Sequence, residues 1–125
     1  MVRKRPKYLN LFRIKLPLPG IVSFLHRVSG ALLFIAIPLL LAVLQLTLSS
    51  PADFDKVRQG LGSPLVKLVL LGLLWGYSHH FFAGLRFIAM DMGFGMDLDK
   101  TRLNSWLVVA FSLTLTAMIG GWLLW

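Results

Sequence analysis

Three long stretches of this sequence contain almost no charged side chains, and they constrain the fold more than any other feature. Residues 31–48 and 103–125 carry no charge, and residues 68–87 are interrupted only near their end by two histidines and an arginine. A helix rises about 1.5 Å per residue, so about 20 such residues cross a hydrocarbon core of about 30 Å. Three segments are too few to close a barrel, and none alternates like a strand. The sequence predicts an all-α membrane protein with three transmembrane helices.

These stretches divide the chain into six segments. We expect a basic N-terminal segment over residues 1–20, transmembrane helices over residues 21–48, 65–90 and 103–125, and connections over residues 49–64 and 91–102. A mean hydropathy of +0.76 with only 14% charged residues agrees with a membrane protein. Pro38 should kink the first helix modestly.

The basic residues are distributed unevenly around the three predicted helices. Ten of them precede the first apolar stretch or flank the second connection: Arg3, Lys4, Arg5, Lys7, Arg13, Lys15, Arg27, Arg86, Lys100 and Arg102. The first connection has only two, opposed by two aspartates, and Lys67 follows it. The positive-inside rule therefore predicts a cytoplasmic N-terminus and a periplasmic C-terminus, with Trp122 and Trp125 at the outer interface. Because topology accounts for the positive charge, we expect no binding of nucleic acid.

The N-terminal segment does not have the pattern of a cleaved targeting peptide. The first apolar stretch is too long and too far from Met1 for a signal peptide, and the Pro-rich residues 16–20 do not suit an amphipathic transit peptide. We expect an uncleaved, multi-pass protein of the bacterial inner membrane. The chain has no cysteine, so it offers no thiolate to zinc or to an iron–sulfur cluster.

A first polar cluster marks the start of the first predicted helix. Ser23, His26, Arg27 and Gly30 are spaced so that they share one helical face. The hydroxyl, imidazole and guanidinium then lie at the boundary between water and lipid, where they suit the polar head of a ligand with an apolar body. The alternative is that Arg27 extends to lipid phosphates while Ser23 and His26 cap or orient the helix.

A second cluster consists of Gly72, Gly76, His80 and Gly84, each four residues from the next. This spacing gives one narrow stripe along a helix. Close helix packing explains the glycines but not the histidine among them. An imidazole between glycines suits an axially ligated porphyrin, so we predict that His80 binds haem iron in a groove left by Gly76 and Gly84. His79 points about 100° away and is the weaker candidate.

The stripe offers one axial ligand, so a six-coordinate haem would take its second ligand from another chain. Beyond His80, Arg86 and Asp91 are five residues apart and do not face each other well as a helical ion pair. Arg86 and Arg27 are expected at similar depth. Either both meet carboxylates of a cofactor, or Arg86, together with Lys100 and Arg102, acts only as a topology determinant.

These motifs resemble the cytochrome b subunit of bacterial succinate dehydrogenase, the larger of its two membrane anchors. The matching stretches are Arg5-Pro6, Asn10-Leu11, Ser23-Phe24-Leu25-His26-Arg27-Val28-Ser29-Gly30, Ser49-Ser50-Pro51, and His80-Phe81-Phe82-Ala83-Gly84-Leu85-Arg86 with Asp91. The match covers nearly the whole chain in order and spacing. The combination of the two longer motifs is specific, whereas either motif alone is weak.

The resemblance implies a complex in which a flavoprotein subunit oxidises succinate, an iron–sulfur subunit passes on the electrons, and the anchor helps to reduce ubiquinone. It implies that His80 is an axial ligand of haem b and that a second, smaller anchor supplies the other histidine. Ser23 and Arg27 match residues of the ubiquinone site, and His26 and Arg27 match positions near the haem propionates. Many relatives have a histidine where this chain has Phe87, so no role is carried over to that position.

Two alternatives stay open at this point. The chain could anchor a fumarate reductase that runs the reaction in the opposite direction, and the sequence does not separate the two directions. It could also be a cofactor-free anchor or assembly protein, in which the glycine stripe only packs helices and Arg27 only binds lipid head groups.

Overall fold

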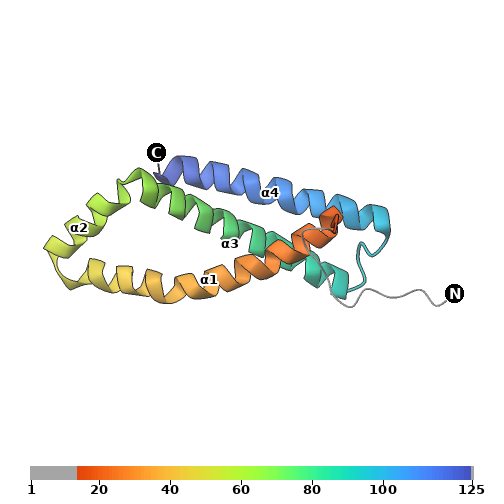
Figure 1. Cartoon of the computed structure of the whole chain (residues 1–125), viewed down its shortest axis with the longest axis horizontal. Coiled ribbons are helices and arrows are strands. Elements are labelled where there is room, and N and C mark those ends of the chain that lie inside the picture. Colours follow the sequence, from red (N-terminus) through yellow and green to blue (C-terminus); the bar gives the residue numbers. More distant parts are fainter. Residues whose placement is uncertain (1–13, 125) are drawn as a thin grey trace.

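The computed structural model describes residues 14–124, which form four helices and no strand (Figure 1). Outside the described residues lie Arg5-Pro6, Asn10-Leu11, Trp125 and the basic residues Arg3, Lys4, Lys7 and Arg13. The helices are α1 (Leu18–Ser49), α2 (Pro51–Leu61), α3 (Pro64–Asp91) and α4 (Leu98–Leu124). Three of them, α1, α3 and α4, are long and apolar enough to cross a membrane. The predicted all-α fold with three spanning helices is confirmed, and the orientation of the termini stays a prediction.

Prolines and glycines set the limits of the helices. Helix α1 starts with a proline in its first turn, and Pro51 and Pro64 open α2 and α3, where the missing N–H is not needed and the fixed φ suits a helix. Helix α3 ends before a turn in which Gly93 and Gly95 have φ of +86° and +69°. A side chain is disfavoured in this left-handed conformation, so the glycines allow the chain to reverse into α4.

The connection over residues 49–64, for which the sequence predicted no element of its own, is largely the short helix α2. Its N-cap is Ser50, whose Oγ accepts a hydrogen bond from the Asp53 amide at 3.1 Å and donates one to the Asp53 carboxylate at 2.8 Å. Lys56 pairs with the same carboxylate at 2.8 Å. These hydrogen bonds, first from Lys56 and then from Ser50, lower the pKa of Asp53 below its usual value.

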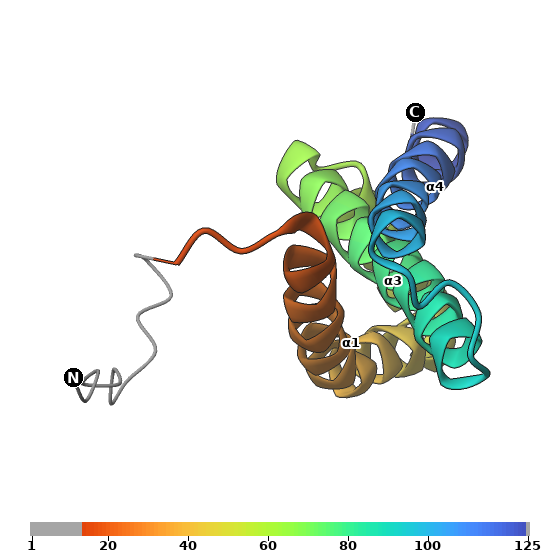
Figure 2. The same cartoon turned by 90° about the vertical axis from the view of Figure 1, so that its right-hand side faces the viewer.

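Helix α3 lies between α1 and α4, and the three meet near the end at which α1 begins (Figures 1 and 2). Val22, Ala83 and Val108, one from each long helix, form the buried core there. Helix α4 buries small residues at near-helical spacing, namely Ser105, Val108, Ser112, Thr116 and Gly120. The three hydroxyl groups donate to backbone carbonyls of their own helix, so α3 and α4 pack closely without leaving these groups unpaired.

The other half of α1 diverges from α3 towards α2 (Figure 1). The last buried residue of α1 is Ala36, and the helix continues for 13 further residues to Ser49. Large apolar side chains there are exposed in the isolated chain, including Leu41 and Leu48. Such a surface suits lipid tails or the helices of another membrane subunit.

Candidate functional site

The first turns of α1 cross the middle of α3, and His26 and His80 meet at the crossing. Their rings stack with centroids 4.2 Å apart and planes inclined by 9°. A Cβ at Gly30 would lie 2.9 Å from Cε1 of His80, closer than real Cβ atoms approach, so a larger residue there would force the His80 ring to shift. A Cβ at Gly84 would lie 3.6 Å from Nε2 of His26, an ordinary contact. The structure therefore brings two predicted site histidines together, each resting on a glycine of the opposite helix.

Hydrogen bonds fix which nitrogen of His80 carries the proton. Its Nδ1 lies 3.1 Å from the carbonyl oxygen of His26. A carbonyl only accepts, so Nδ1 must donate, and the neutral ring keeps its free lone pair on Nε2. Ser29 supports this arrangement, because its hydroxyl donates to the same carbonyl at 3.0 Å and lies 3.3 Å from Nδ1. Metal-binding histidines commonly donate their second nitrogen to a carbonyl in this way.

The glycine stripe of α3 does not line one continuous hollow. His80 lines an apolar cavity of about 610 Å³ between α1 and α3, together with Gly30 and Tyr77. Gly72 and Gly76 line a second apolar cavity of about 500 Å³. Gly84 is covered by the His26 ring. His80 therefore has open apolar space beside it, whereas its glycine neighbours face different surroundings.

His79, the weaker candidate, is buried inside the helix crossing. It is 1% exposed, and its Nε2 lies 3.5 Å from the carbonyl oxygen of Val22. Its ring also packs at a tilt against Trp75. These contacts favour a role in joining α1 to α3, since the ring lines neither of the two large cavities.

Ser23 and Arg27 lie at the edge of the crossing. Arg27 is exposed and Ser23 is half-buried, whereas Gly30 and His26 turn towards α3. Within residues 14–124 no carboxylate forms an ion pair with Arg27. The first cluster is therefore divided: two of its members build the histidine pair, and two face the surroundings of the chain.

Arg86 is separated from that pair by the Phe87 ring, whose centroid lies 5.4 Å from Cζ of Arg86. It is 7% exposed, lies in a groove between α3 and α4, and forms no ion pair with Asp91 in the described part of the chain. Phe87, where the resemblance expected a histidine in relatives, contacts the His26 ring with centroids 5.1 Å apart. Its apolar ring closes one side of the histidine pair.

Sequence reasoning assigned no role to Ser29 and did not consider Asn104. Ser29 is 3% exposed and holds His80, and Asn104 lines the groove at Arg86. One feature of the sequence could have indicated Ser29: its hydroxyl lies one helical turn after His26, at the start of an apolar stretch. Asn104 gave no comparable signal, because its neighbour Arg86 is 18 residues away in the sequence.

No group of three or more histidine, cysteine or acidic side chains gathers around a common point within residues 14–124. A free metal ion usually takes three or four protein ligands. A porphyrin supplies four nitrogen ligands of its own and needs only one or two from protein.

Comparisons with known proteins agree with the arrangement of these motifs. A family model described as "Succinate dehydrogenase/Fumarate reductase transmembrane subunit" matches residues 1–119. The succinate dehydrogenase cytochrome b556 subunit of Coxiella burnetii is 32% identical over 124 residues, covering 98% of this chain and 99% of that protein. Its counterpart in Paracoccus denitrificans is 30% identical over 114 residues, covering 91% and 88%. These matches confirm the resemblance predicted from the motifs: the chain belongs to the succinate dehydrogenase/fumarate reductase transmembrane subunit family.

Proposed function

We propose that this chain is the cytochrome b anchor of a succinate dehydrogenase in the bacterial inner membrane. It binds haem b through His80 and forms part of the site where ubiquinone is reduced. The active complex also includes a flavoprotein, an iron–sulfur subunit and a second small anchor that supplies the other axial histidine. Flavin and iron–sulfur clusters belong to those partners. The chain is not catalytic alone.

The observation that carries the haem proposal is the hydrogen bond from His80 Nδ1 to the His26 carbonyl. It leaves Nε2 as the free donor of a lone pair, in a ring that stacks on His26 and packs closely against Gly30. A ligand nitrogen that is fixed before binding loses little freedom when the metal arrives. Haem, when bound, supplies a one-electron carrier inside the membrane.

The residues around His80 suit the remaining parts of a haem group. The apolar cavity beside His80 matches the porphyrin body, and Gly76 leaves further room on the same helix. His26 and Arg27 are the groups of this chain suited to the propionates. A flat group lying over Gly84 requires the His26 ring to turn aside, because that ring covers the glycine.

Ser23 and Arg27 are the residues proposed for ubiquinone. The quinone oxygens accept hydrogen bonds and gain negative charge as electrons arrive, so a hydroxyl donor and a fixed positive charge stabilise that change. Arg27 is exposed and Ser23 is half-buried in the early turns of α1. This position leaves them free to meet the head group and the partner subunits that enclose it.

The haem proposal is tested by the visible spectrum of the purified complex. We expect His80→Ala to abolish or shift the reduced b-type band, because the replacement has no ligand nitrogen. His79→Gln is the matched control: it replaces the adjacent imidazole, which lines neither large cavity, with a side chain that can still donate to the Val22 carbonyl, and should keep the band. An unchanged spectrum in His80→Ala would refute the ligation and favour a cofactor-free anchor.

The quinone proposal is tested by comparing two electron acceptors. Arg27→Ala and Ser23→Ala should each lower succinate:ubiquinone activity by about tenfold, equivalent to about 1.4 kcal/mol of transition-state stabilisation. Succinate oxidation with an artificial soluble acceptor should survive, because it bypasses the anchor. Arg58→Ala, which removes an exposed charge from α2, serves as the control. Full retention of both activities in the Arg27 and Ser23 variants would show that the site lies elsewhere.

A further inference from the structure

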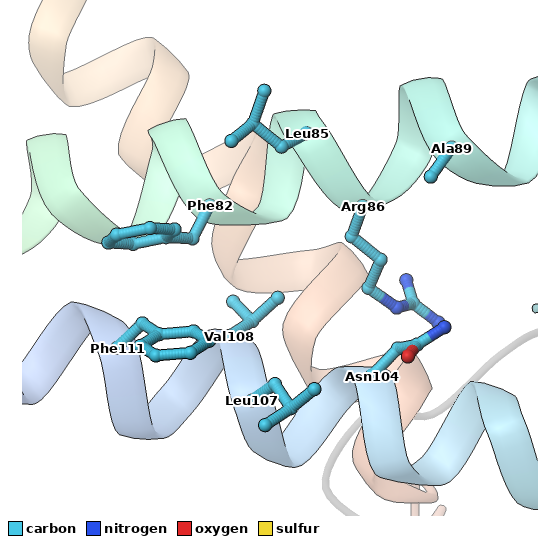
Figure 3. Close-up of a pocket in the computed structure, with 8 residues that line it drawn as sticks. All are labelled: Phe82, Leu85, Arg86, Ala89, Asn104, Leu107, Val108 and Phe111. Atoms are coloured by element: carbon cyan, nitrogen blue, oxygen red, sulfur yellow. The ribbon is translucent and has the colours of Figure 1, made fainter.

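A second site is indicated on the side of α3 that faces α4. There Arg86 projects across a groove of about 240 Å³ towards the side chain of Asn104 (Figure 3). The residue is 7% exposed, and its buried Nε has no hydrogen-bond partner among the described residues. A guanidinium keeps its charge under all ordinary conditions, and a buried donor without a partner is destabilising. The group is therefore placed as if to receive an acceptor from outside the chain.

The surrounding charges indicate that the acceptor is an anion. No carboxylate lines the groove. Asp97, near the start of α4, is paired with Lys100 at 2.7 Å, and Asp91 at the end of α3 is exposed. A buried cation is stable only when it is paired. In the described part of the chain the Arg86 guanidinium has no carboxylate partner, and its Cζ lies only over the Phe87 ring, 5.4 Å from the centroid. A negatively charged ligand would complete the site.

The position of Arg86 along α3 corresponds to the boundary between the hydrocarbon core and the head groups of a bilayer. Helix α3 has 28 residues, so at about 1.5 Å each it spans about 42 Å, close to a membrane with its head groups included. Arg86 lies five residues before Asp91, or about 7.5 Å along the axis from that end. A guanidinium at this level meets the phosphates and glycerol groups of lipids rather than the middle of their tails.

The walls of the groove indicate an apolar body attached to the anion. Phe82 and Phe111 pack at one end of the groove, with ring centroids 5.6 Å apart, and Leu107 lies alongside (Figure 3). Arg86 and Asn104 occupy the other end (Figure 3). The groove is thus polar at the membrane surface and apolar towards the interior, which is the order of groups in a phospholipid.

We propose that the groove between α3 and α4 binds an anionic phospholipid, with its phosphate on Arg86 and Asn104 and an acyl chain along Phe82, Leu107 and Phe111. An anionic lipid is favoured over a zwitterionic one, because the groove contains no carboxylate to receive an ammonium group. The proposal does not depend on haem. Six residues separate Arg86 from His80, so their side chains leave α3 on faces about 120° apart.

The test uses the complete complex, purified in detergent, stripped of lipid and examined by native mass spectrometry with added lipid. We expect phosphatidylglycerol to be retained about tenfold more strongly than phosphatidylcholine. Arg86→Gln should lose this preference, and Arg86→Lys should keep part of it. Arg102→Gln is the matched control, because it removes an exposed positive charge from the same end of α4 and should behave as the wild type.

Other outcomes would overturn the proposal. Equal retention of the two lipids by the wild-type complex, or unchanged retention in Arg86→Gln, would do so. Displacement of phosphatidylglycerol by millimolar inorganic phosphate would assign the groove to a soluble anion. Loss of haem with retained lipid in Arg86→Gln would assign the guanidinium to the cofactor. If Arg86→Gln fails to assemble, Leu107→Trp, which fills the groove without removing charge, should still reduce retention of phosphatidylglycerol.

Discussion

The two halves of the α1–α3 pair differ in what fills the space between the helices. Near the start of α1, the helices cross closely: Val22 and Ala83 are fully buried, and His26 stacks on His80. Two apolar cavities lie between the helices from Ser29 and Gly30 onwards, and beyond Ala36 α1 has no further buried residue. The polar side chains buried between the two helices are concentrated in the closed half, and the cavities are lined mainly by apolar side chains.

This difference separates what the chain fixes by itself from what its surroundings supply. In the closed half, hydrogen bonds and glycine contacts hold each histidine in one position, since an unpaired polar group is costly away from water. In the open half, leucines and isoleucines have no preferred partner, because lipid tails are as apolar as another helix. The closed half should therefore respond sharply to substitution and the open half only weakly.

The largest expected difference between the two halves is in stability, when the same Ala→Leu substitution is made in each half. Ala83 is 0% exposed among three helices, so Ala83→Leu should overpack the core and destabilise the chain by about 1–3 kcal/mol. Ala42→Leu, on the exposed part of α1, should change stability by less than about 0.5 kcal/mol. Unfolding of the full chain in mixed micelles measures both. Equal effects would show that the two halves do not differ in packing.

A smaller effect is expected on haem retention when alanine replaces either Gly30, which contacts His80, or Gly72, which does not. In Gly30→Ala the new Cβ would lie 2.9 Å from His80 Cε1, so the imidazole must shift. We expect haem retention to fall about fivefold, or about 1 kcal/mol. Gly72→Ala meets no atom within 4 Å and should retain haem normally. A Gly30→Ala complex with wild-type haem content and spectrum would contradict the tight crossing.

Two buried serines allow a finer comparison. Ser29 bonds to the His26 carbonyl and lies beside His80, whereas Ser78 bonds only to its own helix at Leu74. Each loss of a hydroxyl should cost about 0.5–1.5 kcal/mol of stability. Only Ser29→Ala should also shift the haem midpoint potential, because it changes the support of the ligand. A shift of the same size in Ser78→Ala would indicate a general packing effect.

The smallest effect concerns α2, which closes the open end. The pKa of Asp53 is held below its usual value of 3.8 by Lys56 and Ser50. The stabilisation is therefore complete above that value and is lost as pH falls through the lower pKa of the folded chain. Amide exchange in α2 should rise on acidification, and Asp53→Asn should remove this pH response. A response that persists in Asp53→Asn would place its origin elsewhere.

Much of the fold could be predicted from the sequence because spanning a membrane leaves few options. The three apolar stretches required helices, and Pro38 did not prevent α1 from continuing to Ser49. The capped helix α2 was missed, since its 11 residues have no long apolar stretch. Its Ser50 and Asp53, three residues apart, carried a capping signal that sequence reasoning did not use.

The candidate site was predictable residue by residue but not as an arrangement. Helical spacing identified His80 and the first cluster, yet it joined Gly76 and Gly84 into one groove, whereas in the structure His26 covers Gly84. Periodicity places residues on a face of their own helix. It does not tell which side chain of another helix will fill the space in front of them.

The sequence by itself determined that the chain crosses a membrane three times and carries histidine and arginine near one boundary. Those features follow from local composition, because each peptide group in lipid must be satisfied within its own helix. Only the tertiary structure decided that His26 supports His80 and that Arg86 faces α4 instead of the histidine pair. These relations depend on the crossing of separate helices, which is set by the contacts of small residues such as Gly30 and Ala83 across the whole interface.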